Sequence, residues 1–157
     1  MFITIKLGMC QRPCTLIIDT GADIALIKAH IVNGKQMINK GNKCIINGVT
    51  EGRIKTIAST NTNIIIDDFE IPHQFQLVTG KFPITTDGIL GRDFLTKYEC
   101  NLCLKTWLLT FTFQNETIEI PIQDTWENSS IIPPRCQIIK PYKRSNLDFL
   151  CKLNNQR

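Results

Sequence analysis

The residues best placed for chemistry are Asp19, Thr20 and Gly21, which follow an apolar run at residues 16–18. A carboxylate held in a tight turn at the end of a strand can act as a general acid or base. Two carboxylates about 3 Å apart share one proton, because both cannot ionise comfortably. Asp-Thr-Gly occurs once in the chain. Hydrolysis of a peptide bond by such a pair would therefore need a second copy of the chain.

Rival catalytic or metal-binding groups are weaker. Residues 124–126 read Asp-Thr-Trp, so they do not form a second loop of this kind. No Gly-x-Ser-x-Gly and no cysteine with a convincing histidine partner offers another nucleophile. Cys100 and Cys103 would point to opposite faces of a strand, and the two histidines, His30 and His73, look like surface or packing residues. We therefore expect no metal and no cofactor.

Length and composition indicate one domain with a short extension. The 157 residues are 43% hydrophobic and 20% charged, which is ordinary for a globular protein. No apolar stretch approaches the roughly 18 to 20 residues that span a bilayer, so we expect no membrane contact. Seven cysteines, an odd number, and no secretory leader favour reduced thiols and a cytoplasmic location.

The basic charge is concentrated in the tail. Residues 1–134 hold 12 Lys/Arg against 13 Asp/Glu, a net −1, whereas residues 135–157 hold 6 against 1, a net +5. A basic tail can contact nucleic acid, but no aromatic interleaving or groove-reading motif supports that role. A solvated linker is the favoured interpretation.

The remaining pattern predicts many short strands and one helix. Residues 92–98 are expected to form the helix, and residues 25–32 a strand or a single helical turn. Asn47-Gly48 favours a hairpin over residues 44–57. Strands are expected at residues 2–7, 15–18, 63–66, 75–78 and 101–104, with a second hairpin at 107–122. This pattern is typical of an all-β barrel.

Three motifs in this order resemble the retroviral-type aspartic proteases (retropepsins), above all those of Ty3/gypsy-type retrotransposons and endogenous retroviruses. They are Asp-Thr-Gly-Ala-Asp at 19–23, the glycine-bearing hairpin at 44–57 and Gly-Ile-Leu-Gly-Arg-Asp-Phe-Leu at 88–95. The resemblance implies a closed acid-protease barrel with one short C-terminal helix over residues 1–104. It implies a C-terminal extension over 105–157, in which a hairpin and a basic linker lead toward a reverse transcriptase.

The resemblance also implies a role for each site residue. Asp19 would be the catalytic carboxylate, Thr20 would bond across a dimer axis, and Gly21 would allow close approach of the substrate. Arg92 would form a buried ion pair with Asp23. The implied substrate-binding residues are Ala22, Asp23, Ile46, Gly48, Val49 and Gly52, and the implied structural supports are Leu90, Gly91 and Arg92.

The implied function is that of a homodimeric aspartic endopeptidase. It would hydrolyse an extended peptide with activated water and process a retroelement polyprotein, in the cytoplasm or within a retroelement particle. Family members often carry a further strand before the one at residues 2–7, so an upstream segment could be missing from the dimer interface. Two alternatives stay open: a non-catalytic module for dimerisation or peptide binding, and a host-adopted protease with a cellular substrate.

Overall fold

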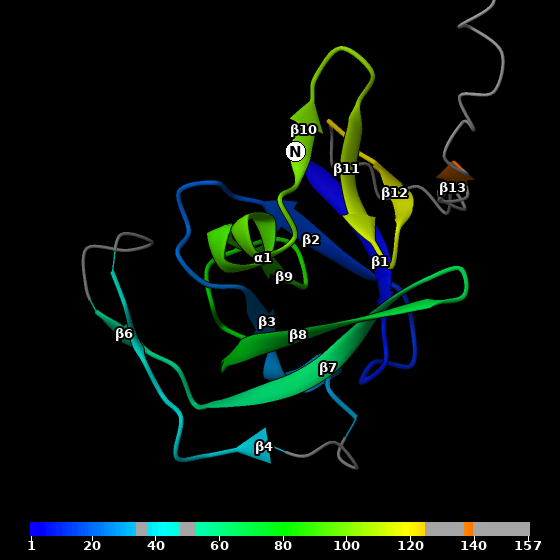
Figure 1. The fold of residues 1–157 in the computed structure, drawn as a ribbon. Coiled ribbons are helices and arrows are strands. Elements are labelled where there is room, and N and C mark those ends of the chain that lie inside the picture. Colours follow the sequence, from blue (N-terminus) through cyan, green and yellow to red (C-terminus); the bar gives the residue numbers. More distant parts are fainter. Residues whose placement is uncertain (34–37, 48–52, 125–136, 140–157) are drawn as a thin grey trace, which may run out of the picture.

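Six strands close into a barrel in the computed structural model, which describes residues 1–33, 38–47, 53–124 and 137–139. The order around the barrel is β1, β2, β9, β3, β8 and β7, and β7 pairs again with β1 (Figure 1). This confirms the predicted all-β class and closed barrel. The barrel strands are β1 (Phe2–Leu7), β2 (Cys14–Ile18), β3 (Leu26–Lys28), β7 (Ala58–Ile66), β8 (Phe69–Val78) and β9 (Gly88–Leu90).

Alternation explains the strand that opens the chain. Ile3, Ile5 and Leu7 are buried, while Lys6 between them is exposed. A period of two places one set of side chains in the core and the other outside. β1 therefore forms over Phe2–Leu7, as its pattern predicts.

The hairpin of β7 and β8 is longer than predicted. Sequence patterns indicated strands only at 63–66 and 75–78, whereas β7 has 9 residues and β8 has 10. The start of β7 is rich in Ser, Thr and Asn, which hid the alternation. Its buried hydroxyls include that of Thr62, which accepts a hydrogen bond from the Met9 amide over 3.1 Å. A buried polar group with a partner is tolerated in a barrel wall.

Two parallel pairings set the position of the Asp19 loop. β2 pairs in parallel with β9, so Ile18 lies opposite Leu90. The chain leaves both strands at the same end of the barrel. β3, which follows the loop, pairs with β9 and β8. Asp19 and Gly91 therefore emerge side by side, although they are far apart in the sequence.

The helix after β9 is short. α1 (Arg92–Lys97) contains Phe94, whose side chain is fully buried, and it matches the helix predicted for residues 92–98. The apolar stretch at 25–32 forms both predicted alternatives in turn, since β3 is followed by a single 3₁₀ turn at Ala29–Ile31. No helix in the described part of the chain is long and apolar enough to cross a membrane.

The hairpin expected at 44–57 stands beside the barrel, after β4 (Ile38–Asn39), which pairs with β7. Its described arms are β5 (Ile45–Ile46) and β6 (Ile54–Lys55), which pair over two residues each. The Thr56 amide extends the ladder by donating to the Cys44 carbonyl over 2.9 Å. The predicted tip residues Gly48, Val49 and Gly52 lie outside the described residues.

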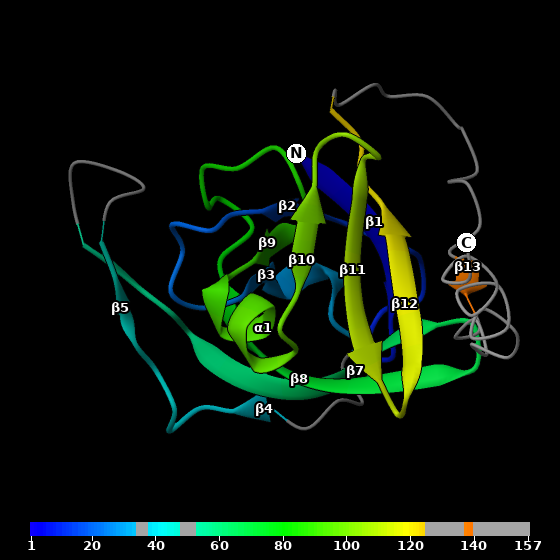
Figure 2. The ribbon, with the colours of Figure 1, turned by 45° about the horizontal axis from the view of Figure 1, so that its top comes forward.

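A second sheet packs on the same core as the barrel. It contains β10 (Asn101–Cys103), β11 (Leu108–Phe113), β12 (Glu116–Pro121) and β13 (Gln137–Ile139), and the pairing of β11 with β12 confirms the predicted hairpin (Figure 2). The buried side chains of Leu109, Phe111 and Ile118 belong to the cluster that includes Ile3 and Phe94. The hairpin thus completes the core. The division into 1–104 and 105–157 stays a prediction, and the basic linker after β13 lies outside the described residues.

Candidate active site

The Asp19 loop is anchored to the strand beside it. The Asp19 amide donates to the Leu90 carbonyl over 3.1 Å, and the Ala22 amide donates to the Asp19 carbonyl over 3.2 Å. Inside the turn, the Gly21 amide donates to Asp19 Oδ1 over 2.9 Å. These bonds fix the direction of the Asp19 side chain. The backbone of the buried Leu90 thus holds the start of the loop, and its predicted role as a structural support stays a prediction.

Gly21 and Gly91 lie where a side chain would crowd neighbouring atoms of the loop. A Cβ on Gly21 would lie 3.2 Å from Asp19 Oδ1, so a side chain there would crowd the carboxylate. A Cβ on Gly91 would lie 2.5 Å from the Ile24 carbonyl carbon, a distance at which something must shift. Gly91 thus lets the loop lie directly on the chain that leads into α1.

The start of α1 holds the second half of the loop. The Arg92 amide donates to the Ala22 carbonyl over 2.7 Å, and the Asp93 amide donates to the Asp23 carbonyl over 3.2 Å. Arg92 Nη2 also pairs with Asp23 Oδ1, as predicted. The expected burial of this pair is wrong for the single chain, because the two side chains are 62% and 76% exposed. Backbone bonds, rather than a buried ion pair, hold the loop from below.

Asp93 is a supporting residue that sequence reasoning missed. Its Oδ2 accepts from the Ala25 amide over 3.0 Å, and its Oδ1 accepts from the Phe94 amide over 2.9 Å. Burial raises the pKa of Asp93, but His73 and the two amides lower it, so this carboxyl titrates below its ordinary range. Its place directly after Arg92, in a motif already recognised, was the available signal.

Asp87 is a second such residue, to which the sequence analysis gave no role in the site. Arg12 donates to both of its carboxylate oxygens, over 2.9 and 2.7 Å, and the Thr15 amide donates to Oδ2 over 3.0 Å. Burial raises the pKa of Asp87, but these donors lower it below the ordinary value. The contact ties the loop before β2 to the start of β9, and therefore braces the two strands that lead to the site.

A cavity of about 590 Å³ lies over the Asp19 loop. It brings together the predicted residues Asp19, Gly21, Ala22, Asp23 and Ile46. Thr20 is exposed beside it but is not among its lining residues. The cavity is also lined by Ile24, Leu26, Cys44, Ile45, Asn47 and Ile89.

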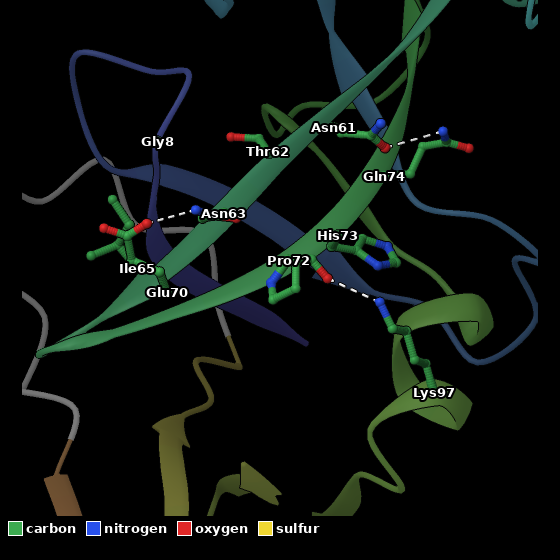
Figure 3. A pocket seen from close by; sticks show the side chains of 10 residues that line it. All are labelled: Gly8, Asn61, Thr62, Asn63, Ile65, Glu70, Pro72, His73, Gln74 and Lys97. Atoms are coloured by element: carbon green, nitrogen blue, oxygen red, sulfur yellow. Dashed lines mark hydrogen bonds between the residues drawn. The ribbon is translucent and has the colours of Figure 1, made fainter. Parts of the chain in front are cut away.

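Another cavity, of about 630 Å³, lies on the outer face of β7 and β8 and is lined by no predicted site residue (Figure 3). Most of its polar side chains have hydrogen-bond partners of their own. Gln74 Nε2 donates to Asn61 Oδ1 over 3.1 Å, and Lys97 Nζ donates to the Pro72 carbonyl over 3.1 Å. Because few donors and acceptors are left for a ligand, the cavity over Asp19 is the candidate site.

The chain matches the family described as retroviral aspartyl protease over residues 2–103. It belongs to that family. The match contains the Asp19 loop, the hairpin arms and the start of α1, which are the parts that the geometry brings together.

Individual relatives agree with this assignment. The Retrovirus-related Pol polyprotein from transposon 412 of Drosophila melanogaster is 31% identical over 162 residues. That alignment covers 99% of this chain but 13% of the relative, so the chain spans a small part of that polyprotein's length. This retroviral aspartyl protease domain is therefore homologous to part of a retrotransposon polyprotein.

A solved structure shares the fold. The retroviral protease-like domain of Ddi1 from Leishmania major has a TM-score of 0.57 and 19% identity, over 78% of this chain and 94% of that one. EIAV protease, in complex with the inhibitor HBY-793, has a TM-score of 0.48 and 22% identity, over 66% of this chain and 92% of that one.

Metal ligation has no basis in the described residues of this protease domain. No group of three or more His, Cys, Asp or Glu side chains among them could hold a metal ion. Cys100 and Cys103 are both free there.

Proposed function

We propose that this chain is an aspartic endopeptidase that works as a homodimer, with one Asp19 from each copy. The observation that carries the proposal is the place of Asp19, on an anchored loop and at the wall of a cavity. In the described residues no second carboxylate is hydrogen-bonded to it. Membership of the retroviral aspartyl protease family supports the same chemistry.

The reaction needs no covalent intermediate. One Asp19 of the pair takes a proton from a bound water, which attacks the carbonyl carbon of the scissile peptide bond. The other Asp19 is protonated, donates a hydrogen bond to the carbonyl oxygen, and then gives a proton to the leaving amine. The two carboxyls titrate together, so their two pKa values belong to the pair. Because one proton must be retained, activity is expected to be highest at acidic to near-neutral pH.

Dimerisation is supported by the exposure of the loop. Thr20 and Gly21 are exposed in the single chain, so a second loop can approach them. The bonds from Leu90 and from the α1 start hold each loop in place before the copies meet. Preorganised groups lose less free energy when the reacting geometry forms.

The cavity supports an extended peptide as substrate. Ile24, Leu26, Ile46 and Ile89 give it an apolar wall that can bury an apolar side chain. The arms β5 and β6 can add main-chain hydrogen bonds to an extended strand. Since the Drosophila relative is a polyprotein, we propose a retroelement polyprotein as the natural substrate.

A peptide-library assay at about pH 5 to 6, where a dyad sharing one proton should work, tests the proposal. Cleavage is measured over a range of protein concentrations, beside Asp19→Asn. We expect activity that rises faster than linearly with concentration in the wild type and none in the variant. Activity that persists in Asp19→Asn would overturn the proposal.

A second measurement distinguishes an enzyme from a non-catalytic module. If the chain cleaves nothing at any concentration, two copies are fused in tandem to force the loops together. Activity of the fusion that requires both Asp19 residues would keep the enzyme assignment. An inactive but dimeric fusion that still binds peptides would favour a non-catalytic module.

A further inference from the structure

His73 is a buried histidine that the proposed chemistry does not use. It lies on β8, at the wall of the outer cavity and facing α1 (Figure 3). Its side chain is 5% exposed. His30, the other histidine of the chain, is exposed. A buried imidazole must place its ring nitrogens against suitable partners or lose hydrogen-bonding free energy.

The partner of His73 Nε2 is the Asp93 carboxylate. Nε2 lies 3.4 Å from Asp93 Oδ2, within ion-pair distance but farther than in an ordinary hydrogen bond. Among the described residues, Nε2 makes no hydrogen bond. An unprotonated Nε2 would place a lone pair against a carboxylate. Nε2 therefore carries a proton, whether the ring is neutral or charged.

The ring of His73 is fixed in this orientation. It meets Phe75 and Phe94 edge to face, with ring centroids 5.1 and 5.2 Å apart and planes close to perpendicular. Thr62 lies opposite His73 on β7 and does not titrate. Rotation away from Asp93 would disturb both aromatic contacts.

The other charged groups around His73 have separate partners. Lys97 of α1 donates to the Pro72 carbonyl, and Glu70 of β8 accepts from Asn63 over 2.6 Å. Tyr98 of α1 also bonds to the Pro72 carbonyl. Among the described residues, Asp93 is therefore the charged side chain that lies against His73 Nε2.

We infer that His73 is a positioning residue for the Asp19 loop: its Nε2–H keeps the Asp93 carboxylate charged and turned toward the Ala25 amide. Ala25 ends the loop that begins at Asp19, so the contact acts on the site from behind. The catalytic consequence rests on the proposed function, but the effect on Ala25 does not.

The test compares His73→Gln with His73→Phe, and His30→Gln serves as control. The amide nitrogen of Gln can reach Asp93 as Nε2 does, whereas Phe keeps the ring but has no donor. The measurement is the NMR shift of the Ala25 amide as the pH of the full chain is lowered. The pH at which this amide loses its bonded shift reports protonation of its acceptor.

We expect the midpoint of that change to rise by about one pH unit in His73→Phe, the size of effect that a close favourable partner has on a carboxyl group. His73→Gln should lie closer to the wild type, and His30→Gln should match it. A purely packing role predicts the opposite order, because Phe preserves the edge-to-face contacts. That order, or a Phe variant equal to wild type, would overturn the inference. If His73→Phe does not fold, His73→Asn, whose shorter amide cannot reach Asp93, replaces it.

Catalysis provides the second readout. If the chain is active, His73→Phe should lower kcat more than it changes KM, with the acid limb of the kcat profile moved to higher pH. If the chain is inactive, the Ala25 titration still decides the role of His73. Failure of the proposed function and failure of this inference are thus distinguishable.

Discussion

The backbone amide of Ala25 donates to the Asp93 carboxylate over 3.0 Å, although 68 residues separate the two in sequence. The carbonyl of Ala25 in turn accepts from the Gln76 amide over 3.0 Å. The backbone of one residue therefore joins the Asp19 loop to α1 through its amide and to β8 through its carbonyl. A change in α1 or in β8 should therefore alter the position of the Asp19 loop.

Asp93→Asn should destabilise the fold. The new NH₂ group would face one of the amides of Ala25 and Phe94, so a donor would meet a donor. Loss of a partly buried acceptor costs about 1–3 kcal/mol. Urea unfolding at pH 7 measures the change, with the exposed turn residue Asp68→Asn as control. Equal stability of the two variants would mean that the Asp93 contacts contribute little.

Gly91→Ala should be destabilising for a steric reason. The added Cβ would lie 2.5 Å from the Ile24 carbonyl carbon and 2.6 Å from its oxygen, both backbone atoms. Overpacking of this kind costs about 1–3 kcal/mol. Gly8→Ala is the matched control, because its Cβ would meet Thr62 at 3.5 Å, an ordinary contact. Thermal unfolding should rank Gly91→Ala well below Gly8→Ala, and the reverse ranking would contradict the close approach.

Arg12→Gln should lower the free energy of unfolding at neutral pH and make it depend less on pH. The pKa of Asp87 is lowered in the folded state, so its contribution is present above the unfolded pKa and is lost as pH falls through the folded pKa. Without Arg12 the folded pKa of Asp87 rises toward its unfolded value, so the variant has less of this stability at neutral pH and less of it to lose as pH falls. Since Arg12 is 59% exposed, screening limits the effect to about 1 kcal/mol.

Urea unfolding measured from pH 7 to pH 3 checks this expectation. Lys105→Gln, which removes an exposed charge without a described ion pair, is the control. The difference in the free energy of unfolding between Arg12→Gln and the wild type should be largest near neutral pH and should vanish below the folded pKa of Asp87. A difference that grows as pH falls would have the wrong sign.

Local sequence was enough to predict the Asp-Thr-Gly turn, the helix α1 and the hairpin of β11 and β12. Asp19 and Gly91 could be recognised from the residues next to them in the sequence. The roles of Asp87 and Asp93 could not be derived this way, since their partners Arg12 and Ala25 lie on other elements. The early part of β7 was missed because its buried Thr and Ser side chains break the apolar alternation.

Thr56→Val should loosen the base of the hairpin at 44–57. The Thr56 hydroxyl donates to Gln76 Oε1 over 2.9 Å and accepts from the Cys44 amide over 2.9 Å. Valine has a similar shape but leaves both groups without that partner, at a cost of about 1–3 kcal/mol. Hydrogen exchange of the Cys44 amide should speed up, and in an active enzyme KM should rise more than kcat falls. The exposed Thr112→Val is the control, and unchanged exchange at Cys44 would refute the coupling.

The exposed pair of Arg92 and Asp23 should contribute little to the stability of a single copy. A double-mutant cycle with Arg92→Gln and Asp23→Asn isolates their coupling, which is about 0.2–1 kcal/mol for exposed pairs. A pair that becomes buried behaves differently, because removal of one partner then costs about 3–5 kcal/mol. Unfolding is therefore measured at increasing protein concentration. A small single-mutant cost at low concentration is the expected result for the single chain, and a cost that grows with concentration would mean that a second copy covers the pair. A large cost at every concentration would contradict the exposure of these side chains.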